Sequence, residues 1–429
     1  MKTLIVGSGG REHALAWTLS KDPDATRIYA APGNPGIAEI ATCVPISATS
    51  IDELASFAAR EQIDLTVVGP EAPLNVGIVD AFRKRRLKIF GPDKRAAQIE
   101  TSKSFAKDLC SNYDIPCPVW DTFRHAGPAI EALDRMGPPW VVKADGLAAG
   151  KGTTVTSDRR EAEQAIQREL KREPGRIVIE EFIDGWEASF TATVSGGRAQ
   201  WLAPVFQDYK PINDGDTGPN TGGMGVYSPV ASVTHELVEK VTRKILDPSV
   251  KAMVTENMPF QGVLYLNIIV PHGSQDPRVL EFNARFGDPE MQGIAPLVEG
   301  GLLAHMKAVA EDSSNPPLPE CSASASVVVV LASKGYPNSP SSGDRITIRE
   351  LSRNNVVLFH AGTATAPNGE LVTAGGRVLN VAATGHDVES ARRDAYSTVD
   401  ESLHFPGMQY RHDIGKREMR RRRLEQIPS

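Results

Sequence analysis

Four short runs of aliphatic and β-branched residues, each closed by a glycine or proline turn, dominate the first hundred residues. The runs are Leu4–Val6, Arg27–Ala30, Leu65–Val68 and Leu87–Phe90, and the turns begin at Gly7, Pro32, Gly69 and Gly91. Helix-length segments separate the runs, so this pattern predicts a doubly wound parallel sheet in an α/β protein. Ligands bind such sheets at the carboxyl edge, where the four turns are expected to meet.

The first turn, Gly7-Ser8-Gly9-Gly10-Arg11-Glu12-His13, follows a strand and opens a helix. Glycines let the backbone approach a ligand closely, and a helix N-terminus attracts an anion. A dinucleotide fingerprint would need glycine at Glu12 and an acidic residue near Ala30–Gly36, and this sequence has neither. The turn therefore favours phosphate or phosphoribose over NAD, with a purely structural turn as the alternative.

A second glycine-rich loop, residues 143–153, separates two β-branched runs and carries Lys143 and Lys151 at its two sides. Backbone donors and two lysines can hold a triphosphate. The loop is not a Walker A motif, which would need glycine at Asp145 and serine or threonine at Gly152. We therefore predict a phosphate-binding flap, and a structural hairpin is the weaker alternative.

The segment Leu280–Glu290 places polar residues at alternate positions of a predicted strand. Glu281, Asn283 and Arg285 then share one face, because successive side chains of a strand point to opposite sides. Carboxylate and amide oxygens suit Mg²⁺, and the guanidinium can hold a phosphoryl group. A solvated strand face is the alternative when this segment is considered alone.

The segment Asp214–Gly225 is rich in glycine and too polar for a core strand. Its small residues would allow a substrate to lie against backbone donors. A flexible surface loop is an equally good interpretation of this segment by itself.

Charge and cysteine content restrict the class of protein. The formal net charge of -6 argues against a nucleic-acid partner, and the basic run 416–423 is better interpreted as a solvated last helix than as an RNA contact. The four cysteines form no Cys-x-x-Cys pair, and no apolar run reaches the length of a membrane span. We expect a cytoplasmic protein with reduced thiols and no membrane partner.

The division of the chain follows from its breaks. A helix from about 102 to 115 leaves the first unit, and a Ser/Asn/Pro-rich stretch at 313–319 precedes a buried strand. We predict an N-terminal α/β domain at 1–102, a central domain at 103–325 with a mobile lobe at about 120–188, and a smaller α/β or β-rich domain at 326–429.

Five strings in this order resemble the glycinamide ribonucleotide synthetase family of ATP-grasp ligases. They are Gly-Ser-Gly-Gly-Arg-Glu-His-Ala (7–14), Val-Gly-Pro-Glu-Ala-Pro-Leu (68–74), Lys-Ala-Asp-Gly-Leu-Ala-Ala-Gly-Lys-Gly (143–152), Gly-Pro-Asn-Thr-Gly-Gly-Met-Gly (218–225) and Glu-Phe-Asn-Ala-Arg-Phe-Gly-Asp-Pro-Glu (281–290). The similarity continues through 359–363 and 375–379, so it covers nearly the whole chain. It implies a two-lobed ATP-grasp domain in the centre and formation of an amide from glycine and 5-phosphoribosylamine, with ATP and Mg²⁺ or Mn²⁺.

The resemblance also implies roles for individual residues. Those for ATP are Lys103, Lys143, Gly146, Gly150, Lys151, Gly152, Glu180, Glu181, Ile183 and Glu187, with Glu187 on the ribose. Those for the other substrates are Gly9, Gly10, Pro32, Gly33, Asn34, Asp208, Asp214, Asn220, Thr221, Gly222 and Arg285. Glu281 and Asn283 would bind the metal, while Arg285, Lys143 and Lys151 would act in catalysis. A monomer is predicted, and a dimer is left open.

Two departures from the family pattern bear on the substrate. The family usually has Asp-His-Lys-Arg where this chain has Asp208-Tyr209-Lys210-Pro211, and glycine where this chain has Asn267. An amide in so apolar a strand needs a partner or points into a pocket. Family drift with local compensation is one explanation. A paralogue for another amino acid or amine, or a nucleotide-binding protein without turnover, are the alternatives.

Overall fold

The computed structural model describes residues 1–147 and 152–425. Its N-terminal part is a parallel five-stranded sheet in the order β3-β2-β1-β4-β5. The strands are β1 (Lys2–Gly7), β2 (Arg27–Pro32), β3 (Thr42–Cys43), β4 (Leu65–Val68) and β5 (Ile89–Phe90), and the helices are α1 (Gly10–Ser20), α2 (Ile51–Glu61), α3 (Glu71–Asn75) and α4 (Ile78–Lys84). The predicted doubly wound sheet is confirmed, and the Gly7 and Gly69 turns leave adjacent parallel strands at the same edge.

Two short helices, α5 (Gln98–Thr101) and α6 (Lys103–Asn112), lead to a separate lobe. Its antiparallel sheet has the order β6-β9-β7-β8. The elements of this lobe are β6 (Trp120–Phe123), α7 (Ala126–Met136), β7 (Trp140–Ala144), β8 (Thr153–Thr156), α8 (Arg159–Glu169) and β9 (Ile177–Glu181). Apolar residues of α7, α8 and the sheet form a core of their own, so this lobe packs independently of the larger cores.

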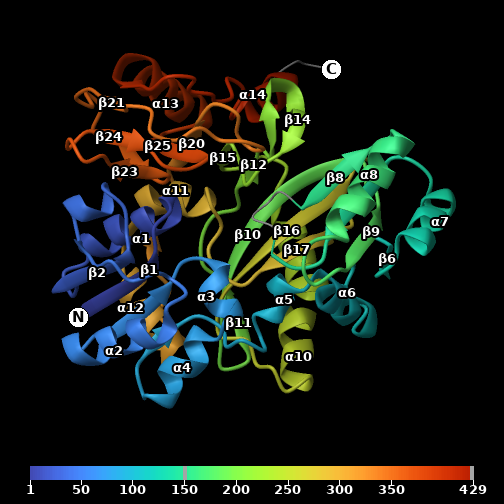
Figure 1. The fold of residues 1–429 in the computed structure, drawn as a ribbon, viewed down its shortest axis with the longest axis horizontal. Coiled ribbons are helices and arrows are strands. Elements are labelled where there is room, and N and C mark those ends of the chain that lie inside the picture. Colours follow the sequence, from blue (N-terminus) through green and yellow to red (C-terminus); the bar gives the residue numbers. More distant parts are fainter. Residues whose placement is uncertain (148–151, 426–429) are drawn as a thin grey trace.

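The central sheet is antiparallel and has the order β11-β10-β16-β17, with β17 at its edge. Its strands are β10 (Gly185–Ser195), β11 (Arg198–Trp201), β16 (Gly262–Pro271) and β17 (Arg278–Asn283). The accompanying helices are α9 (His235–Val241), a π-helical turn (Thr242–Leu246), α10 (Asp247–Thr255), α11 (Glu290–Ile294) and α12 (Leu302–Ala310). Figure 1 shows this sheet between the blue N-terminal part and the lobe that carries α7 and α8.

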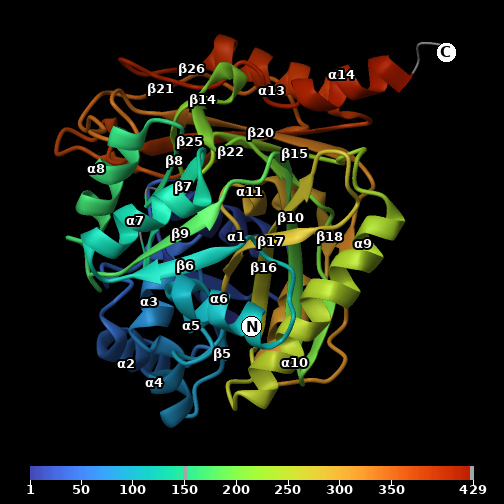
Figure 2. The same ribbon diagram turned by 90° about the vertical axis from the view of Figure 1, so that its right-hand side faces the viewer.

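The C-terminal part adds a fourth sheet, in the order β12-β15-β20-β25-β22. It joins β12 (Gln207–Asp208) and β15 (Gly225–Ser228) to β20 (Ala325–Ala332), β22 (Val356–His360) and β25 (Arg377–Gly385), next to α13 (Val388–Ser402) and α14 (Lys416–Glu425). Figure 2 shows α13 and α14 along one side of this sheet. Two strands of the predicted central segment thus pair within the C-terminal sheet, which fixes the Asp208 end of the glycine-rich segment to that part.

The remaining strands form two-stranded ribbons. They are β13 (Pro211–Asn213) with β14 (Thr217–Asn220), β18 (Val298–Gly300) with β19 (Glu320–Cys321), β21 (Thr347–Ile348) with β26 (Leu403–His404), and β23 (Thr363–Thr365) with β24 (Leu371–Thr373). Short 3₁₀ turns cover Ile37–Glu39, Asp214–Asp216 and Ala295–Leu297. None of the helices within 1–147 and 152–425 has the length and apolarity that crossing a membrane requires.

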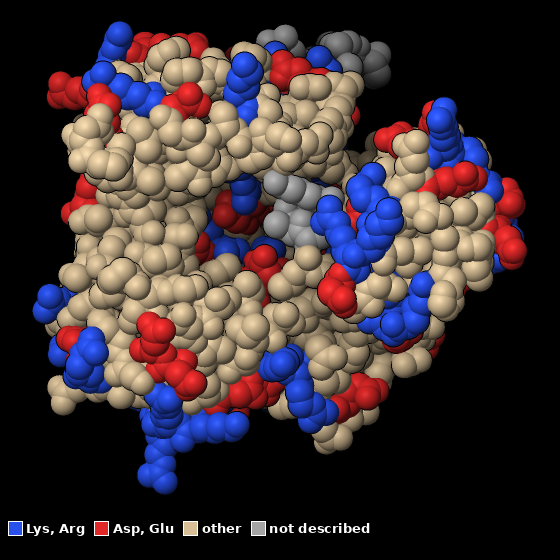
Figure 3. Space-filling model, viewed as in Figure 1, with Lys and Arg blue, Asp and Glu red and all other residues tan. Residues whose placement is uncertain are grey.

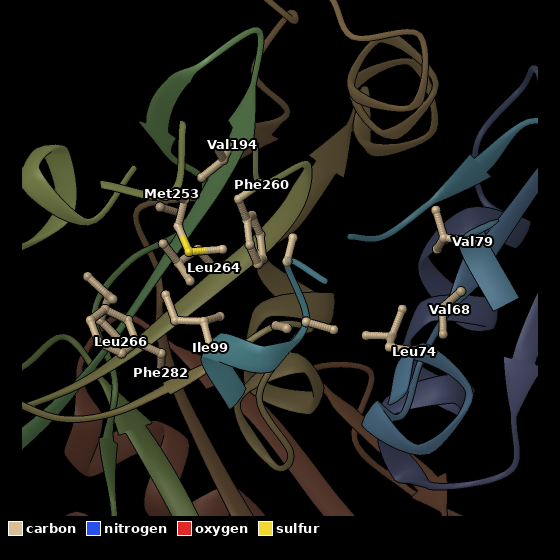
Figure 4. Packing of buried hydrophobic residues seen from close by; sticks show 14 of the residues in the cluster. Val68, Leu74, Val79, Ile99, Val194, Met253, Phe260, Leu264, Leu266 and Phe282 are labelled. Carbon is tan, nitrogen blue, oxygen red and sulfur yellow. The ribbon is translucent and has the colours of Figure 1, made fainter. Parts of the chain in front are cut away.

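One buried core runs from the N-terminal sheet into the central sheet. Val68 and Leu74 on the first side, Ile99 between, and Leu266 and Phe282 on the second side belong to the same cluster (Figure 4). Burial of each such side chain contributes roughly 1.5–3 kcal/mol, so the two parts hold each other rigidly. The carboxyl edge of the first sheet is therefore fixed relative to the strand that carries Glu281.

Candidate functional site

A cavity of about 410 Å³ lies where the lobe, the central sheet and the N- and C-terminal parts meet. Figure 3 shows a hollow near the middle of one face, with acidic and basic side chains inside it. Fifteen residues predicted from sequence line it: Lys103, Lys143, Gly146, Gly152, Glu180, Glu181, Ile183, Glu187, Asp208, Asn220, Thr221, Gly222, Glu281, Asn283 and Arg285. The predicted Gly150 and Lys151 lie outside the described residues.

A buried triad of one carboxylate and two lysines forms one wall of the cavity. Glu180 Oε2 lies 2.9 Å from Lys143 Nζ, and Glu180 Oε1 lies 3.2 Å from Lys107 Nζ. Burial opposes the charge of Glu180, but Lys143 and Lys107 outweigh it and lower its pKa. Lys107 was not predicted, although it lies one helical turn after Lys103 on α6 and that spacing could have revealed it.

The start of the glycine-rich loop is anchored to α6. Asp145 accepts a hydrogen bond from Ser104 Oγ at 2.7 Å and another from the Ser104 amide at 3.2 Å, and it pairs with Arg176. Lys103 Nζ donates to the Gly146 carbonyl oxygen at 3.1 Å. Burial, followed by the nearby charge of Lys143, lowers the pKa of Lys103, while Glu281 opposes this shift. An anion in the cavity would stabilise both ammonium groups.

Glu281 and Asn283 project from β17 into the cavity at alternate positions, as predicted. Burial opposes ionisation of Glu281, but Lys210, Lys143 and Lys103 together lower its pKa to about 2. Asn283 Oδ1 accepts a hydrogen bond from Arg285 Nη2 at 2.9 Å. The strand therefore presents an ionised carboxylate and an oriented amide oxygen to the same space.

Arg285 is held by two carboxylates that the sequence argument did not identify. Its guanidinium lies 2.9 Å from Glu100 Oε1 and 3.5 Å from Glu71 Oε2. Burial opposes the charge of Arg285, whereas Glu100 and Glu71 raise its pKa and keep it protonated. Glu71 stands in the Gly69-Pro70-Glu71 turn, so the expected convergence of turns at the sheet edge was the available signal.

The two departures from the family pattern have different positions. Tyr209 is buried beside the C-terminal segment, where its hydroxyl accepts a hydrogen bond from the Gly415 amide at 3.1 Å and the guanidinium of Arg417 lies 4.0 Å from its ring centre. Asn267 lines the cavity, and its Nδ2 donates to Glu187 Oε2 at 3.0 Å. The buried amide therefore has a partner and also faces the cavity.

Lys210, beside Tyr209, joins two predicted site residues. Its Nζ lies 3.1 Å from Glu187 Oε2 and 3.6 Å from Glu281 Oε1. Burial opposes its charge, but Glu187 and Glu281 raise its pKa above the ordinary value. Lys210 thus adds a further cation to the cavity beside Lys103, Lys143 and Arg285.

A pair of acidic residues, Asp208 and Glu290, also lines the cavity. Glu290 Oε1 accepts hydrogen bonds from Ser189 Oγ and from the Tyr265 hydroxyl, each at 2.9 Å. Burial and the charge of Glu290 raise the pKa of Asp208 well above its usual range. This pair can accept hydrogen bonds from an amine, and Gly223 and Gly287 pack so closely against it that added side chains would meet its carboxyl oxygens.

Arg377, from β25, connects the glycine-rich segment to the segment after β17. Its Nη1 donates to the Gly222 carbonyl oxygen at 2.7 Å and to the Asp288 carbonyl oxygen at 2.8 Å. Its Nη2 lies 3.3 Å from Asp288 Oδ2. Arg377 lines the cavity, although it belongs to a part of the chain for which the sequence argument assigned no site residue.

Six predicted substrate residues lie off the described wall of this cavity: Gly9, Gly10, Pro32, Gly33, Asn34 and Asp214. Asn34 is held between the carbonyl oxygens of Ser8 and His360, and Asp214 accepts from the His412 amide. A side chain at Gly10 would collide with Asn380 and Gln292, which gives this glycine a packing role. Gly9 lies beside a residue that lines the cavity, because a Cβ there would be 3.7 Å from Asp288 Oδ2.

Comparison with known proteins gives a consistent result over the whole chain. Models of the phosphoribosylglycinamide synthetase N domain, ATP-grasp (A) domain and C domain match residues 1–100, 101–291 and 326–417. The phosphoribosylamine–glycine ligase of Xanthomonas axonopodis pv. citri is 43% identical over 99% of this chain and 100% of its own length. That of Salmonella typhimurium strain LT2 is 44% identical over 98% of this chain and 99% of its own.

Solved structures agree with these relatives. The crystal structure of phosphoribosylamine–glycine ligase from Thermotoga maritima is 33% identical, has a TM-score of 0.83 and covers 96% of this chain and 100% of that chain. Biotin carboxylase from Campylobacter jejuni, solved as a beta-gamma-ATP complex, is 16% identical with a TM-score of 0.72 and covers 98% of this chain and 95% of that chain. The second match supports the ATP-grasp fold alone.

Proposed function

The chain belongs to the phosphoribosylglycinamide synthetase family, and from this premise we propose that it is an ATP-dependent ligase that joins glycine to 5-phosphoribosylamine. The products are glycinamide ribonucleotide, ADP and phosphate, as in purine biosynthesis. The observation that carries the proposal is the convergence of Lys103, Lys143, Lys210 and Arg285 on Glu281 and Asn283 in one cavity. Such a set can neutralise a polyphosphate and align it for transfer.

The nucleotide would lie between the lobe and the central sheet. We assign its phosphates to Lys103, Lys143 and the loop from Gly146 to Gly152, including Gly150 and Lys151. Its adenine would lie along Glu180, Glu181 and Ile183, and its ribose near Glu187, all of which line the cavity. The Glu180 triad supports this assignment, because an arriving polyphosphate provides a second anion for Lys143.

Glu281 and Asn283 fit a divalent cation such as Mg²⁺ or Mn²⁺. They offer hard oxygen ligands on one strand face, and the lowered pKa of Glu281 keeps its carboxylate ionised at neutral pH. When bound, the cation would neutralise charge on the phosphates. Lys210 already neutralises part of the Glu281 charge, so the cation and Lys210 would share this carboxylate.

The chain's own residues account for the two chemical steps. The glycine carboxylate attacks the γ-phosphate to give glycyl phosphate and ADP, and the amine of phosphoribosylamine then displaces phosphate. Arg285, fixed by Glu71 and Glu100, stabilises the transferring phosphoryl group. Asp208 and Glu290 accept hydrogen bonds from substrate amine, with Asn220, Thr221 and Gly222 forming the adjoining wall.

The phosphoribose would extend from this centre toward the first sheet. Gly9, Gly10, Pro32, Gly33 and Asn34 stay the predicted residues of this subsite, with Asp214 predicted at the substrate side. Asp288 and Arg11 line the cavity beside the first turn and support the assignment. The domain boundaries at 102 and 325, a monomeric state and a cytoplasmic location stay predictions as well.

A coupled ADP-release assay across a panel of amino acids tests the proposal. We expect ADP release that depends on both glycine and phosphoribosylamine, and Glu281→Ala should lose turnover while its circular dichroism spectrum is retained. A preference for another amino acid would replace the glycine assignment. Nucleotide binding without any ADP release would reduce the protein to a binding module.

A further inference from the structure

The strand register brings Asn267 next to the predicted metal ligands. Asn267 of β16 is the direct cross-strand partner of Glu281, and Tyr265 is the partner of Asn283. Directly opposed residues have Cβ atoms about 4.5–5.5 Å apart. All four of these side chains line the cavity. Asn267 therefore faces the same space as Glu281, from the neighbouring strand.

Within residues 1–147 and 152–425, Tyr265 is the other direct cross-strand partner of these two ligands that carries a side-chain oxygen. β17 is the edge strand, so its residues have neighbouring strand residues only on the β16 side. The Tyr265 hydroxyl already interacts with Ser189 Oγ at 2.7 Å and Glu290 Oε1 at 2.9 Å. Asn267 is left as the candidate.

The amide of Asn267 is fixed in one orientation. Its Nδ2 donates to Glu187 Oε2, the oxygen that also lies 3.1 Å from Lys210 Nζ. Reversing the amide would place Oδ1 against this carboxylate oxygen, so the orientation shown is the stable one. Among the described residues, the side chain of Asn267 makes its hydrogen bond through Nδ2, so Oδ1 can accept a ligand.

We propose that Asn267 Oδ1 is a third protein oxygen in the coordination sphere of the divalent cation assigned to Glu281 and Asn283. The inference rests on the metal site of the proposed function. A carboxamide oxygen is a hard, neutral donor that suits Mg²⁺ and Mn²⁺. It strengthens binding without adding a negative charge beside the phosphates. The family's usual glycine at this position has no side chain and cannot contribute in this way.

The inference can be tested by measuring Mn²⁺ binding with electron paramagnetic resonance in the presence of a saturating non-hydrolysable ATP analogue. Asn267→Leu keeps a similar volume and removes the oxygen, so the Mn²⁺ dissociation constant should rise about tenfold. Asn267→Asp keeps an oxygen toward the cation but places its second oxygen against Glu187 Oε2, so its Mn²⁺ affinity should lie above that of Asn267→Leu. Ile269→Leu, on the same strand and cavity face, should change the constant less than twofold.

A second measurement separates metal ligation from a role in positioning Glu187. ADP binding in the presence of EDTA should be nearly the same in Asn267→Leu as in the original protein if the amide acts through the cation. Two results would overturn the proposal. One is a Mn²⁺ dissociation constant of Asn267→Leu within twofold of the original, and the other is Asn267→Asp binding Mn²⁺ no more tightly than Asn267→Leu. If Asn267→Leu fails to fold, Asn267→Gly replaces it, because the family tolerates glycine there.

These outcomes do not depend on turnover. If ADP release proves independent of glycine and phosphoribosylamine while Mn²⁺ binding still follows residue 267, the proposed reaction fails and the metal assignment stands. If the reaction is observed but the Mn²⁺ dissociation constant is the same in the variants at residue 267, the reaction stands and the third ligand is rejected.

Discussion

The Glu180 triad allows a stability prediction that can be tested without any substrate. The side chains of Glu180, Lys107 and Lys143 are 2%, 5% and 8% exposed, so Glu180→Gln leaves two buried ammonium groups without their anion. Breaking a buried ion pair by removing one partner costs about 3–5 kcal/mol. The adjoining cavity admits water and glutamine keeps one acceptor oxygen, so we expect a loss near the lower limit, about 3 kcal/mol.

Hydrogen exchange of the β7 and β9 amides measures this loss as a change in the local opening free energy. Glu181→Gln is the matched control, because that carboxylate pairs with Arg278 at 2.6 Å where both side chains are more than a third exposed. An exposed pair contributes about 0–1 kcal/mol. Saturating ADP should recover part of the Glu180→Gln loss, since phosphates would replace the missing anion. Equal losses in the two variants would refute the reasoning.

The pH dependence follows from the lowered pKa of Glu180. A carboxyl group whose pKa is lower in the folded state stabilises the protein above its unfolded value, near 4.5, and loses this effect as the pH falls through the folded value. The difference between the original protein and Glu180→Gln should therefore be constant from pH 6 to 8. It should shrink once the pH falls below about 4.5.

The remaining predictions concern two buried histidines, Tyr209 and Arg377. Burial lowers the pKa of His13 to about 3, with His360 contributing, and the pKa of His360 to about 4, so the unfolded chain binds more protons below pH 6.5. Unfolding free energy from urea titrations should fall by up to about 1.4 kcal/mol per pH unit per histidine between pH 6.5 and 4, and a flat profile would contradict this. Tyr209→Phe should cost about 1 kcal/mol in the same titration through loss of the Gly415 hydrogen bond. Because Tyr209 lies outside the cavity, Tyr209→His should leave the KM for glycine within about twofold of the original, and a larger change would restore the paralogue idea. Arg377→Lys should lower kcat/KM by roughly tenfold, because lysine cannot hold Gly222 and Asp288 with one planar group; unchanged kinetics would confine Arg377 to a structural role.

Local patterns in the sequence were sufficient for the parts of the site that lie within one element. Alternation correctly placed Glu281 and Asn283 on one strand face, but Arg285, predicted on the same face, follows the end of β17 at Asn283. The turns after β1 and β4 meet at the sheet edge as the parallel pattern required. The strands on either side of the glycine loop, β7 and β8, also pair with each other, as its position between two β-branched runs indicated. Each of these inferences depends on backbone periodicity or turn chemistry, which nearby residues determine.

Contacts between distant segments could not be inferred in this way. Glu71 and Glu100 reach Arg285 from the N-terminal part, Lys107 shares Glu180 with Lys143, and Arg377 crosses from β25. The same limit explains why sequence could name the departure at Asn267 but not its partner.

What the sequence alone determined was the chain's α/β architecture, its family and the two short segments that carry lysine and carboxylate. Tertiary packing alone decided which charges neutralise one another. It also decided that Tyr209 is buried outside the cavity, whereas Asn267 lines it. The physical reason is range: hydrogen-bonding periodicity acts over a few residues, whereas the electrostatic environment of a buried group depends on every segment that surrounds it.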